Sequence, residues 1–388
     1  MSKSSIRPAF SDEHEAFRGM VCAFIDKEVA PHYATWEAAG LVDRSLFRAA
    51  GDLGMLMFGT PAEFGGAGID DWRFSAVVNE EFARAGYASV GLGLALQNDV
   101  AAPYFTELTN SEQKARWLPG LTSGDSIAAV AMTEPAAGSD LAGIKTAARR
   151  DGTDYILNGS KTFITNGQNA DFVVVAARTS QDRHRGLTLF VVERGMPGFE
   201  RGQNLDKLGL HGQDTSELFF NDVRVPAANR LGPEDGKGFY QLVRNLPQER
   251  LSLAVMAAAS AEGVLSRTLE YVQSRSAFGQ PVGTFQHSRF VLAELQTELD
   301  IARVFVDHCI ELHTRHELTP VLAAKAKWWV SELQFKVADR CLQLHGGYGY
   351  IREYPVARAF VDSRVQSIYG GTNEIMREII GQDMGLKP

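Results

Sequence analysis

Residues 151–167 read DGTDYILNGSKTFITNG, and this stretch sets the fold class for the middle of the chain. Three turn dipeptides punctuate it: Asp151-Gly152, Asn158-Gly159 and Asn166-Gly167. Short β-forming runs lie between and around these turns, at 127–132, Tyr155 to Leu157, 171–177, 187–193 and 217–225. Together they predict a compact antiparallel β-domain of roughly a hundred residues.

The chain before this β-rich part is typical of helices. Ser11 can cap a helix whose first turn carries Asp12, Glu13 and Glu15, which suits the positive end of the helix dipole. Its apolar face is formed by Phe17, Met20, Val21 and Phe24, and Pro31 ends it. We then expect a loop at 61–68, a small-residue helix around 85–105, and a segment from Ser111 with a capping-like Gln113.

The chain after Pro226 returns to helix. Three long helical segments are expected at 238–274, 284–316 and 319–344, with a shorter one at 372–381. Thr319 followed by Pro320 is a sound helix start. The predicted fold class is therefore α+β and multidomain, with an N-terminal helical domain (1–122), a middle antiparallel β-domain (123–232) and a C-terminal four-helix bundle (233–388).

Composition excludes several classes of protein. The 388 residues carry 39 Lys and Arg against 47 Asp and Glu, a net charge of −8, which argues against a nucleic-acid surface. No apolar window approaches the roughly 20 residues of a membrane-spanning helix. The start MSKSSIRPAF lacks the apolar core of a secretory signal, and Cys22, Cys309 and Cys341 form no disulfide pattern. We therefore expect a cytoplasmic protein without nucleic-acid or membrane partners.

Common catalytic motifs are missing. The sequence has no complete dinucleotide fingerprint, no phosphate loop, no zinc-binding HExxH and no GxSxG elbow. His313 and His316 stand three residues apart, but nothing nearby completes a metal site, so we expect no metal and a solvated helix face there.

Four segments carry a resemblance to the flavin-dependent acyl-CoA dehydrogenase family. They are AMTEPAAGSDLAGIKT (131–146), NGSKTFITNG (158–167), RSAFGQPVGTFQ (275–286) and LQLHGGYGYIREYPVARAFVDSRVQSIYGGTNEIMREII (342–380). The likeness runs from about residue 11 to 381 in the family's domain order. It implies FAD as cofactor and an acyl-CoA as substrate.

The resemblance also implies two sets of FAD contacts. The first, at the flavin ring and phosphate, comprises Val130, Ala131, Met132, Thr133, Gly138, Ser139, Phe163, Ile164 and Thr165. The second, for the adenine half, would come from a neighbouring subunit: Arg275, Phe278, Gln286, Gln343, Leu344, His345, Gly346 and Gly347, with Thr372, Asn373 and Glu374 at a helix start. An arginine suits a pyrophosphate, and glycines let backbone approach a nucleotide closely.

Members of the family remove an α-proton from the acyl thioester while a β-hydride leaves to flavin N5. Most use a Glu directly after a Tyr as the base, but here Tyr369 is followed by Gly370 and Gly371. The sequence resembles the long-chain and isovaleryl branch, in which the base lies on a helix before an Arg-Leu pair, and LPQERL supplies Glu249. Buried among Leu246, Leu251 and Leu253, Glu249 should have a raised pKa.

The same resemblance implies the rest of the site. Gly370 leaves room for a base from the opposite wall, and a backbone N–H near it would bind the thioester oxygen. Other residues expected at the substrate are Ser139, Tyr240, Pro247, Gln248, Arg250, Tyr369 and Gly371. Medium-to-long or branched acyl chains, electron-transferring flavoprotein as acceptor and a homotetramer are the expectations. A carrier-protein-bound or unusual acyl thioester, or a non-catalytic FAD-binding partner subunit, are the alternatives.

Overall fold

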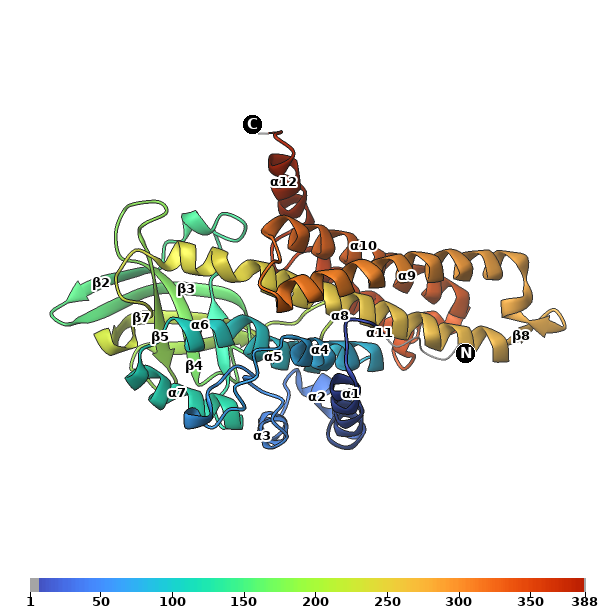
Figure 1. Ribbon diagram of the computed structural model, residues 1–388, viewed down its shortest axis with the longest axis horizontal. Helices are drawn as coiled ribbons and strands as arrows, with labels where there is room; N and C mark the ends of the chain where they lie inside the picture. The colour runs from blue at the N-terminus through green and yellow to red at the C-terminus, as the bar shows by residue number, and fades with distance from the viewer. Residues whose placement is uncertain (1–6, 387–388) are drawn as a thin grey trace.

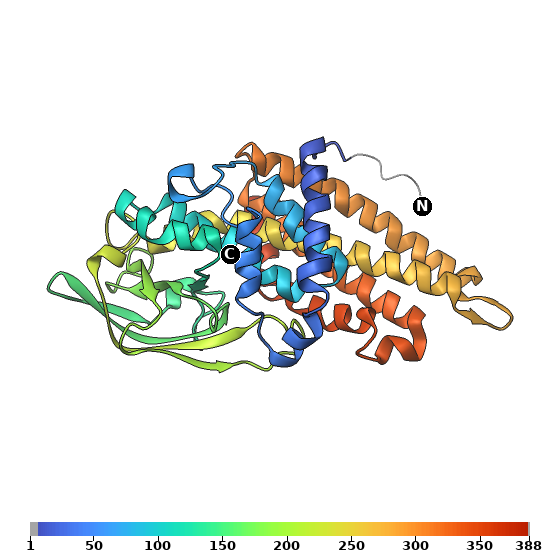
Figure 2. The same cartoon turned by 90° about the horizontal axis from the view of Figure 1, so that it is seen from below.

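The computed structural model describes the chain from Arg7 to Leu386. A β-domain lies at one end of an elongated molecule, long helices form the other end, and the N-terminal helices pack beside both (Figure 1). The view from below shows the same arrangement, with the sheet and the β8 hairpin at opposite ends (Figure 2). The predicted three-part α, β, α organisation is confirmed.

The N-terminal part contains more helices than the sequence predicted. They are α1 (Asp12–Phe24), α2 (Tyr33–Ala39), α3 (Ser45–Asp52), α4 (Arg73–Ala85), α5 (Ala88–Ala95), α6 (Ala102–Glu107) and α7 (Ser111–Ser123), with π-helical turns at Ile25–Val29 and Leu96–Ala101 and a 3-10 turn at Ala62–Phe64. Ser11 is the N-cap of α1, as expected. Helix α7 begins at Ser111, as expected, and its N-cap is Asn110, which exchanges hydrogen bonds of 2.9 Å with Gln113.

The middle part is a seven-stranded sheet. Its strands are β1 (Ala128–Ala131), β2 (Ala147–Asp151), β3 (Asp154–Thr165), β4 (Phe172–Arg178), β5 (Leu187–Glu193), β6 (Phe199–Asn204) and β7 (Thr215–Val225). The order is β1-β4-β2-β3-β7-β6, and β5 also pairs with β4. Side chains alternate along β4: Val174 and Ala176 join the helical core, whereas Val173 and Val175 face a separate core of the sheet.

Two expectations about this sheet were wrong. It is not purely antiparallel, because β1 and β2 both pair with β4 in parallel. Asn158-Gly159 is not a turn but lies inside β3, where the strand slips register against β7 between Leu157 and Gly159. A bulge absorbs the glycine there, so the strand continues through a dipeptide that usually reverses the chain.

The C-terminal part is a bundle of long helices. They are α8 (Gly238–Ser274), α9 (Gln286–Thr314) and α10 (Pro320–His345), followed by the shorter α11 (Pro355–Ser363) and α12 (Asn373–Asp383). A small hairpin of β8 (Ser276–Ala277) and β9 (Gln280–Pro281) joins α8 to α9. Helix α11 packs on α8 and α10, whereas α12 packs against α10 and points away from the bundle (Figure 1). The predicted short helix at 372–381 is therefore present, but α11 takes the fourth place beside the long helices.

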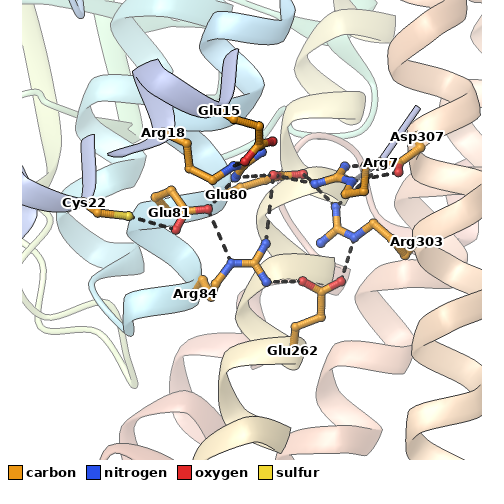
Figure 3. Close-up of polar contacts among 10 residues, drawn as sticks. All are labelled: Arg7, Glu15, Arg18, Cys22, Glu80, Glu81, Arg84, Glu262, Arg303 and Asp307. Carbon is orange, nitrogen blue, oxygen red and sulfur yellow. Dashed lines mark hydrogen bonds and ion pairs between the residues drawn. The ribbon is translucent and has the colours of Figure 1, made fainter. Parts of the chain in front are cut away.

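A cluster of charged side chains joins the N-terminal part to the bundle (Figure 3). Glu80 of α4 is fully buried and pairs with arginines from three separate segments: Arg7, Arg18 and Arg303. Glu262 of α8 extends the cluster by binding Arg303 and Arg84. The cluster holds α1, α4, α8 and α9 in fixed positions relative to one another.

No helix between Arg7 and Leu386 is long and apolar enough to cross a membrane. Within the same part of the chain, Cys22, Cys309 and Cys341 are all free thiols.

Candidate active site

Helix α8 carries the predicted base in its first half. The helix runs through Pro247, which has no N–H to give to the turn before it. Glu249 and Arg250 stand two and three residues after this proline and are 6% and 5% exposed. This turn of the helix thus brings a carboxyl group and a guanidinium into the interior side by side.

Glu249 is in a state suited to taking a proton. Burial raises the pKa of its carboxyl group to about 7, although Arg250 and the Tyr104 hydroxyl act in the opposite direction. Its Oε1 atom is buried and has no hydrogen-bond partner among the described residues. A carboxylate oxygen that is shielded from water and not engaged by the protein is free to accept a proton from a bound molecule.

The Gly370–Gly371 turn lies against this part of α8. Gly370 has a φ of +64°, and a Cβ at this position would come within 2.5 Å of Leu253 Cδ1. The Arg250 Nε–H reaches the carbonyl oxygen of Gly370 at 3.4 Å. The structure therefore brings Arg250, the residue next to Glu249, to Gly370 across 120 positions of sequence.

The expected flavin-ring residues gather around β1 and β3. The N–H of Thr162 donates to the Thr133 carbonyl at 3.0 Å, which fixes the end of β1 beside β3. Phe163 stands on a bulge with a φ of +59° and is 66% exposed. A bare aromatic ring beside Thr133 and Thr165 is a surface that a flat ring system would cover, so these residues fit the flavin that the sequence implies.

Behind this surface lies a buried ion pair. The Lys161 ammonium binds Glu134 and the Met132 carbonyl, each at 2.9 Å. Glu134 in turn accepts hydrogen bonds from the backbone N–H groups of Lys145 and Thr146. These bonds tie the loop after β1 to β3 and hold Thr133 in place.

Most of the expected adenine-half residues gather at the opposite end of the molecule, around the β8–β9 hairpin and the end of α10. Thr372, Asn373 and Glu374 do not, because they begin α12 directly after the Gly370–Gly371 turn, beside Arg250 and Lys327. Arg275 lies over the ring of Tyr348 at 5.9 Å, and the Tyr271 hydroxyl donates to the His345 carbonyl at 3.2 Å. Phe278, at the tip of the β8–β9 hairpin, is 97% exposed. This set includes a cation and uncovered aromatic rings, which suits a nucleotide.

The two sets of FAD residues do not meet within one chain. Arg275 follows α8, 26 positions after Glu249, which corresponds to about 39 Å along the helix axis. Figure 1 shows the β8 hairpin and the sheet at opposite ends. Within one chain, the residues at the hairpin therefore lie far from the flavin-ring residues on the sheet.

Some residues expected at the substrate have other contacts. The Gln248 amide donates to the Asp99 carbonyl at 2.7 Å and faces His313 Nε2 at 3.1 Å, so its side chain connects α8 to α9 and the π turn. His313 is thus partly buried and engaged, which corrects the expectation of a solvated face for this residue, whereas His316 is exposed as expected. Tyr240 is exposed and packs against Phe239, and Ser139 lies on an exposed loop.

Sequence reasoning missed two buried polar residues beside the site. Tyr104 of α6 is fully buried, and its hydroxyl lies close enough to Glu249 to affect its pKa, yet it forms no hydrogen bond of ordinary length. Lys327 of α10 binds the Gly371 carbonyl. Tyr104 lies in the apolar run AAPYF and Lys327 beside Lys325, so neither carries a signal in the sequence.

Family comparisons cover nearly all of the chain. Residues 11–125 match the family model for the N-terminal domain of acyl-CoA dehydrogenases, residues 129–223 the middle domain, and residues 236–385 the C-terminal domain.

Individual proteins give the same result. The mitochondrial long-chain specific acyl-CoA dehydrogenase of Sus scrofa is 48% identical over 382 residues, covering 98% of this chain and 88% of that protein. The crystal structure of an acyl-CoA dehydrogenase from Geobacillus kaustophilus superimposes with a TM-score of 0.94 at 47% identity, covering 97% and 98% of the two chains. A glutaryl-CoA dehydrogenase from Mycobacterium smegmatis, solved in complex with FADH2, gives a TM-score of 0.91 at 29% identity, covering 98% and 96%.

Proposed function

Because the chain belongs to the acyl-CoA dehydrogenase family, we propose that it removes the α-proton of an acyl-CoA with Glu249 as the base. The protein is an FAD-dependent acyl-CoA dehydrogenase, a flavoprotein oxidoreductase of fatty-acid metabolism. What the family alone does not assign is which carboxylate acts, because the position after Tyr369 is a glycine here.

One observation carries the assignment. Glu249 is a buried carboxyl group with a raised pKa and an unpartnered oxygen, and it lies on the helix that packs against the Gly370 turn. A carboxylate with a pKa near 7 is a stronger base than an exposed one, and it is partly ionised at neutral pH and largely ionised above it. Arg250, directly beside it, favours the ionised form.

The second requirement is polarisation of the thioester carbonyl, because an α-C–H is a weak acid. The backbone N–H groups of Gly370 and Gly371 have no acceptor within the described part of the chain. We assign the hydrogen bond to the thioester oxygen to this turn. Transfer of the α-proton to Glu249 and departure of a β-hydride then give a trans-2-enoyl-CoA.

FAD, when bound, supplies the two-electron acceptor for the hydride. Thr133, Phe163 and Thr165 would hold its ring system, and the Lys161–Glu134 pair keeps this part of the sheet in place. Arg275, Phe278 and His345 would hold the adenine half of a cofactor bound to a second copy. The position of the sheet and the β8 hairpin at opposite ends of the chain supports this division (Figure 1).

The proposal therefore includes assembly, and a homotetramer is the state the family resemblance favours. Electron-transferring flavoprotein is the proposed acceptor of the electrons, on the same ground. Three free cysteines suit a reducing compartment, and the cytoplasm is the proposed location.

Medium-to-long or branched acyl chains are the proposed substrates. The similarity to a long-chain enzyme supports this choice. The wall after Glu249 also supports it, because the run LSLAVMAAASA at 251–261 offers small side chains. An acyl group on a carrier protein is the second candidate.

The test is an anaerobic titration of the holoprotein with straight C4, C8 and C16 acyl-CoA and with isovaleryl-CoA, read by flavin absorbance. The wild-type flavin should bleach with at least one of them. Glu249→Gln keeps the shape but removes the base, so bleaching should slow at least about 100-fold. The matched control is Glu270→Gln, an exposed position on the same helix, which should leave the rate unchanged.

Each outcome has a distinct meaning. Full-rate bleaching in Glu249→Gln removes Glu249 from the role of base. FAD-loaded protein that no acyl-CoA reduces moves the assignment to a carrier-bound thioester. Protein that takes up no FAD by itself supports a non-catalytic partner subunit.

A further inference from the structure

The Gly370–Gly371 turn is held by two cations from different helices. Arg250 of α8 reaches the Gly370 carbonyl at 3.4 Å, and Lys327 of α10 donates to the Gly371 carbonyl at 2.8 Å. The same ammonium also donates to Asn373 Oδ1 at 3.0 Å, at the first turn of α12. Lys327 therefore connects α10, the turn and the start of α12.

Lys327 is an unusual buried cation. Its side chain is fully buried, and its ammonium forms no ion pair with any carboxylate in the described chain. Both its acceptors are neutral oxygens. Burying a charge without a counter-charge destabilises a fold. Fold stability alone therefore does not account for a lysine at this position.

The conformation of the turn requires such a restraint. Both glycines have positive φ, +64° and +91°, which glycine alone adopts at low cost. Glycine is also the most flexible residue, so a diglycine turn has many alternative conformations. Each carbonyl shares a peptide plane with the N–H of the next residue, so binding the Gly370 and Gly371 oxygens fixes the two planes on either side of Gly371 and, with them, the direction of the Gly371 N–H. The N–H groups of Gly370 and Gly371 have no protein acceptor in the part of the chain that the structure describes.

We propose that Lys327 is a positioning residue for the reaction: its ammonium holds the Gly370–Gly371 turn so that the free backbone N–H groups face the thioester oxygen. The inference rests on the proposed function of Glu249 and this turn. Asn373 and Ser331 support the ammonium in turn, because the Asn373 amide donates to Ser331 Oγ at 3.1 Å. The positive charge of Lys327 also favours the negative charge that the thioester oxygen gains as the α-proton leaves.

The first experiment compares Lys327→Met with Lys325→Met in the FAD-loaded protein. Lys325 lies two residues earlier on α10 and is exposed, so it controls for the loss of a lysine from this helix. The rate of flavin reduction per bound flavin should fall about 10- to 100-fold in Lys327→Met, the size of one lost charge-assisted hydrogen bond. FAD content and the acyl-CoA concentration for half-maximal rate should change little.

A second measurement isolates the proton step. An acyl-CoA with sulfur in place of the β-carbon has an acidified α-C–H and no β-hydride to give. Its enolate, next to oxidised flavin, absorbs at long wavelength. Wild type should develop this band, and Lys327→Met should form it more weakly at equal occupancy. Lys327→Gln, which keeps N–H donors, should recover part of the band and serves as the test variant if the Met variant does not fold.

The inference is overturned if Lys327→Met or Lys327→Gln reduces its flavin and forms the band as Lys325→Met does. It is also overturned if the lower FAD content of the variant accounts for the entire loss of rate. Failure of the proposed function itself would give a different result. If Glu249 is not the base, the Glu249→Gln variant reduces its flavin at the wild-type rate, and this result does not depend on the residue at position 327.

Discussion

At the residue level, the basicity of Glu249 is set by its burial and by two neighbours. Burial raises its pKa to about 7, and both Arg250 and Tyr104 lower it from where burial alone would place it. Among the described residues, the Tyr104 hydroxyl and Glu249 Oε1 are each without a hydrogen bond of ordinary length. Active-site hydrogen bonds are often long in free enzymes and shorten in complexes. Tyr104 is thus positioned to stabilise the ionised base.

Tyr104→Phe tests this contact. Without the hydroxyl, the pKa of Glu249 should rise above about 7, so a larger fraction of the base is protonated at neutral pH. The rate of flavin reduction should rise with pH in both proteins, with the midpoint displaced upward in the variant. The measurement is the single-turnover rate between about pH 5.5 and 9, which brackets the pKa of the base. Tyr33→Phe, a buried tyrosine bonded to Ser89, is the control, and an unchanged or lower midpoint would exclude the role of Tyr104.

Single residues also differ in how far the sequence reveals them. Glu249 and Gly370 can be connected from the sequence alone, because one position gains a carboxylate where the other lacks it. In the structure, Arg250 and Leu253, the neighbours of Glu249 on α8, contact Gly370. Tyr104 and Lys327 cannot be found in this way. Their importance comes from burial and from contacts across more than forty positions, and local spacing carries neither.

At the level of elements, prediction succeeded where local chemistry was strong. Helix α8 has the predicted bounds, and the Thr319-Pro320 start of α10 was correct. Strands β6 (FERGQN) and β2 (AARRD) were missed because they are edge or half-exposed strands. Their charged side chains and glycine are uncommon in strands and give no β-strand pattern in the sequence. Helix α4 was also missed, because it has no side-chain N-cap that would mark its start in the sequence. Parallel pairing of β1 with β4 depends on contacts that no single segment encodes.

Helix α4 is held to its neighbours by the charge cluster of Figure 3. Burial by itself would raise the pKa of Glu80, but Arg303 and Arg7 lower it well below its ordinary value. Its contribution to stability is therefore complete above the ordinary carboxyl pKa and is lost as the pH falls toward the lowered one.

Glu80→Gln should destabilise the protein by about 3–5 kcal/mol, because it leaves several buried arginines without their shared partner. Chemical unfolding of the holoprotein at pH 7, followed by circular dichroism, measures the change. The difference from wild type should shrink as the pH is lowered through the acidic range, since protonation also neutralises Glu80. Glu13→Gln, an exposed position on α1, is the control. Equal stability of Glu80→Gln and this control would show that the cluster contributes nothing net.

At the level of the whole molecule, the proposed FAD site is divided between two copies of the chain. The proposed flavin-ring residues lie on the sheet, and Arg275 and Phe278 of the proposed adenine set lie at the β8 hairpin; the sheet and the hairpin are at opposite ends of the structure (Figure 1, Figure 2). Helix α9, beside the hairpin, exposes apolar side chains in one stripe: Phe290, Ile301 and Val304. Spacings of eleven and three residues put all three on one helical face. An exposed apolar face of this kind is typical of a protein–protein interface. A second copy that packs on it would lie next to the hairpin residues and could complete the FAD site there.

The double variant Ile301→Asp/Val304→Asp tests this arrangement. Ile301 and Val304 are 60% and 72% exposed, so two carboxylates there should leave the isolated fold intact and oppose association through repulsion and lost apolar contact. Light scattering should show a smaller species than wild type. Flavin content should fall in parallel, because separating the copies divides each FAD site. Leu53→Asp, an exposed apolar position on the N-terminal side, should change neither property. Wild-type protein that is monomeric yet fully loaded with FAD would contradict the divided site, since one chain would then hold the whole cofactor.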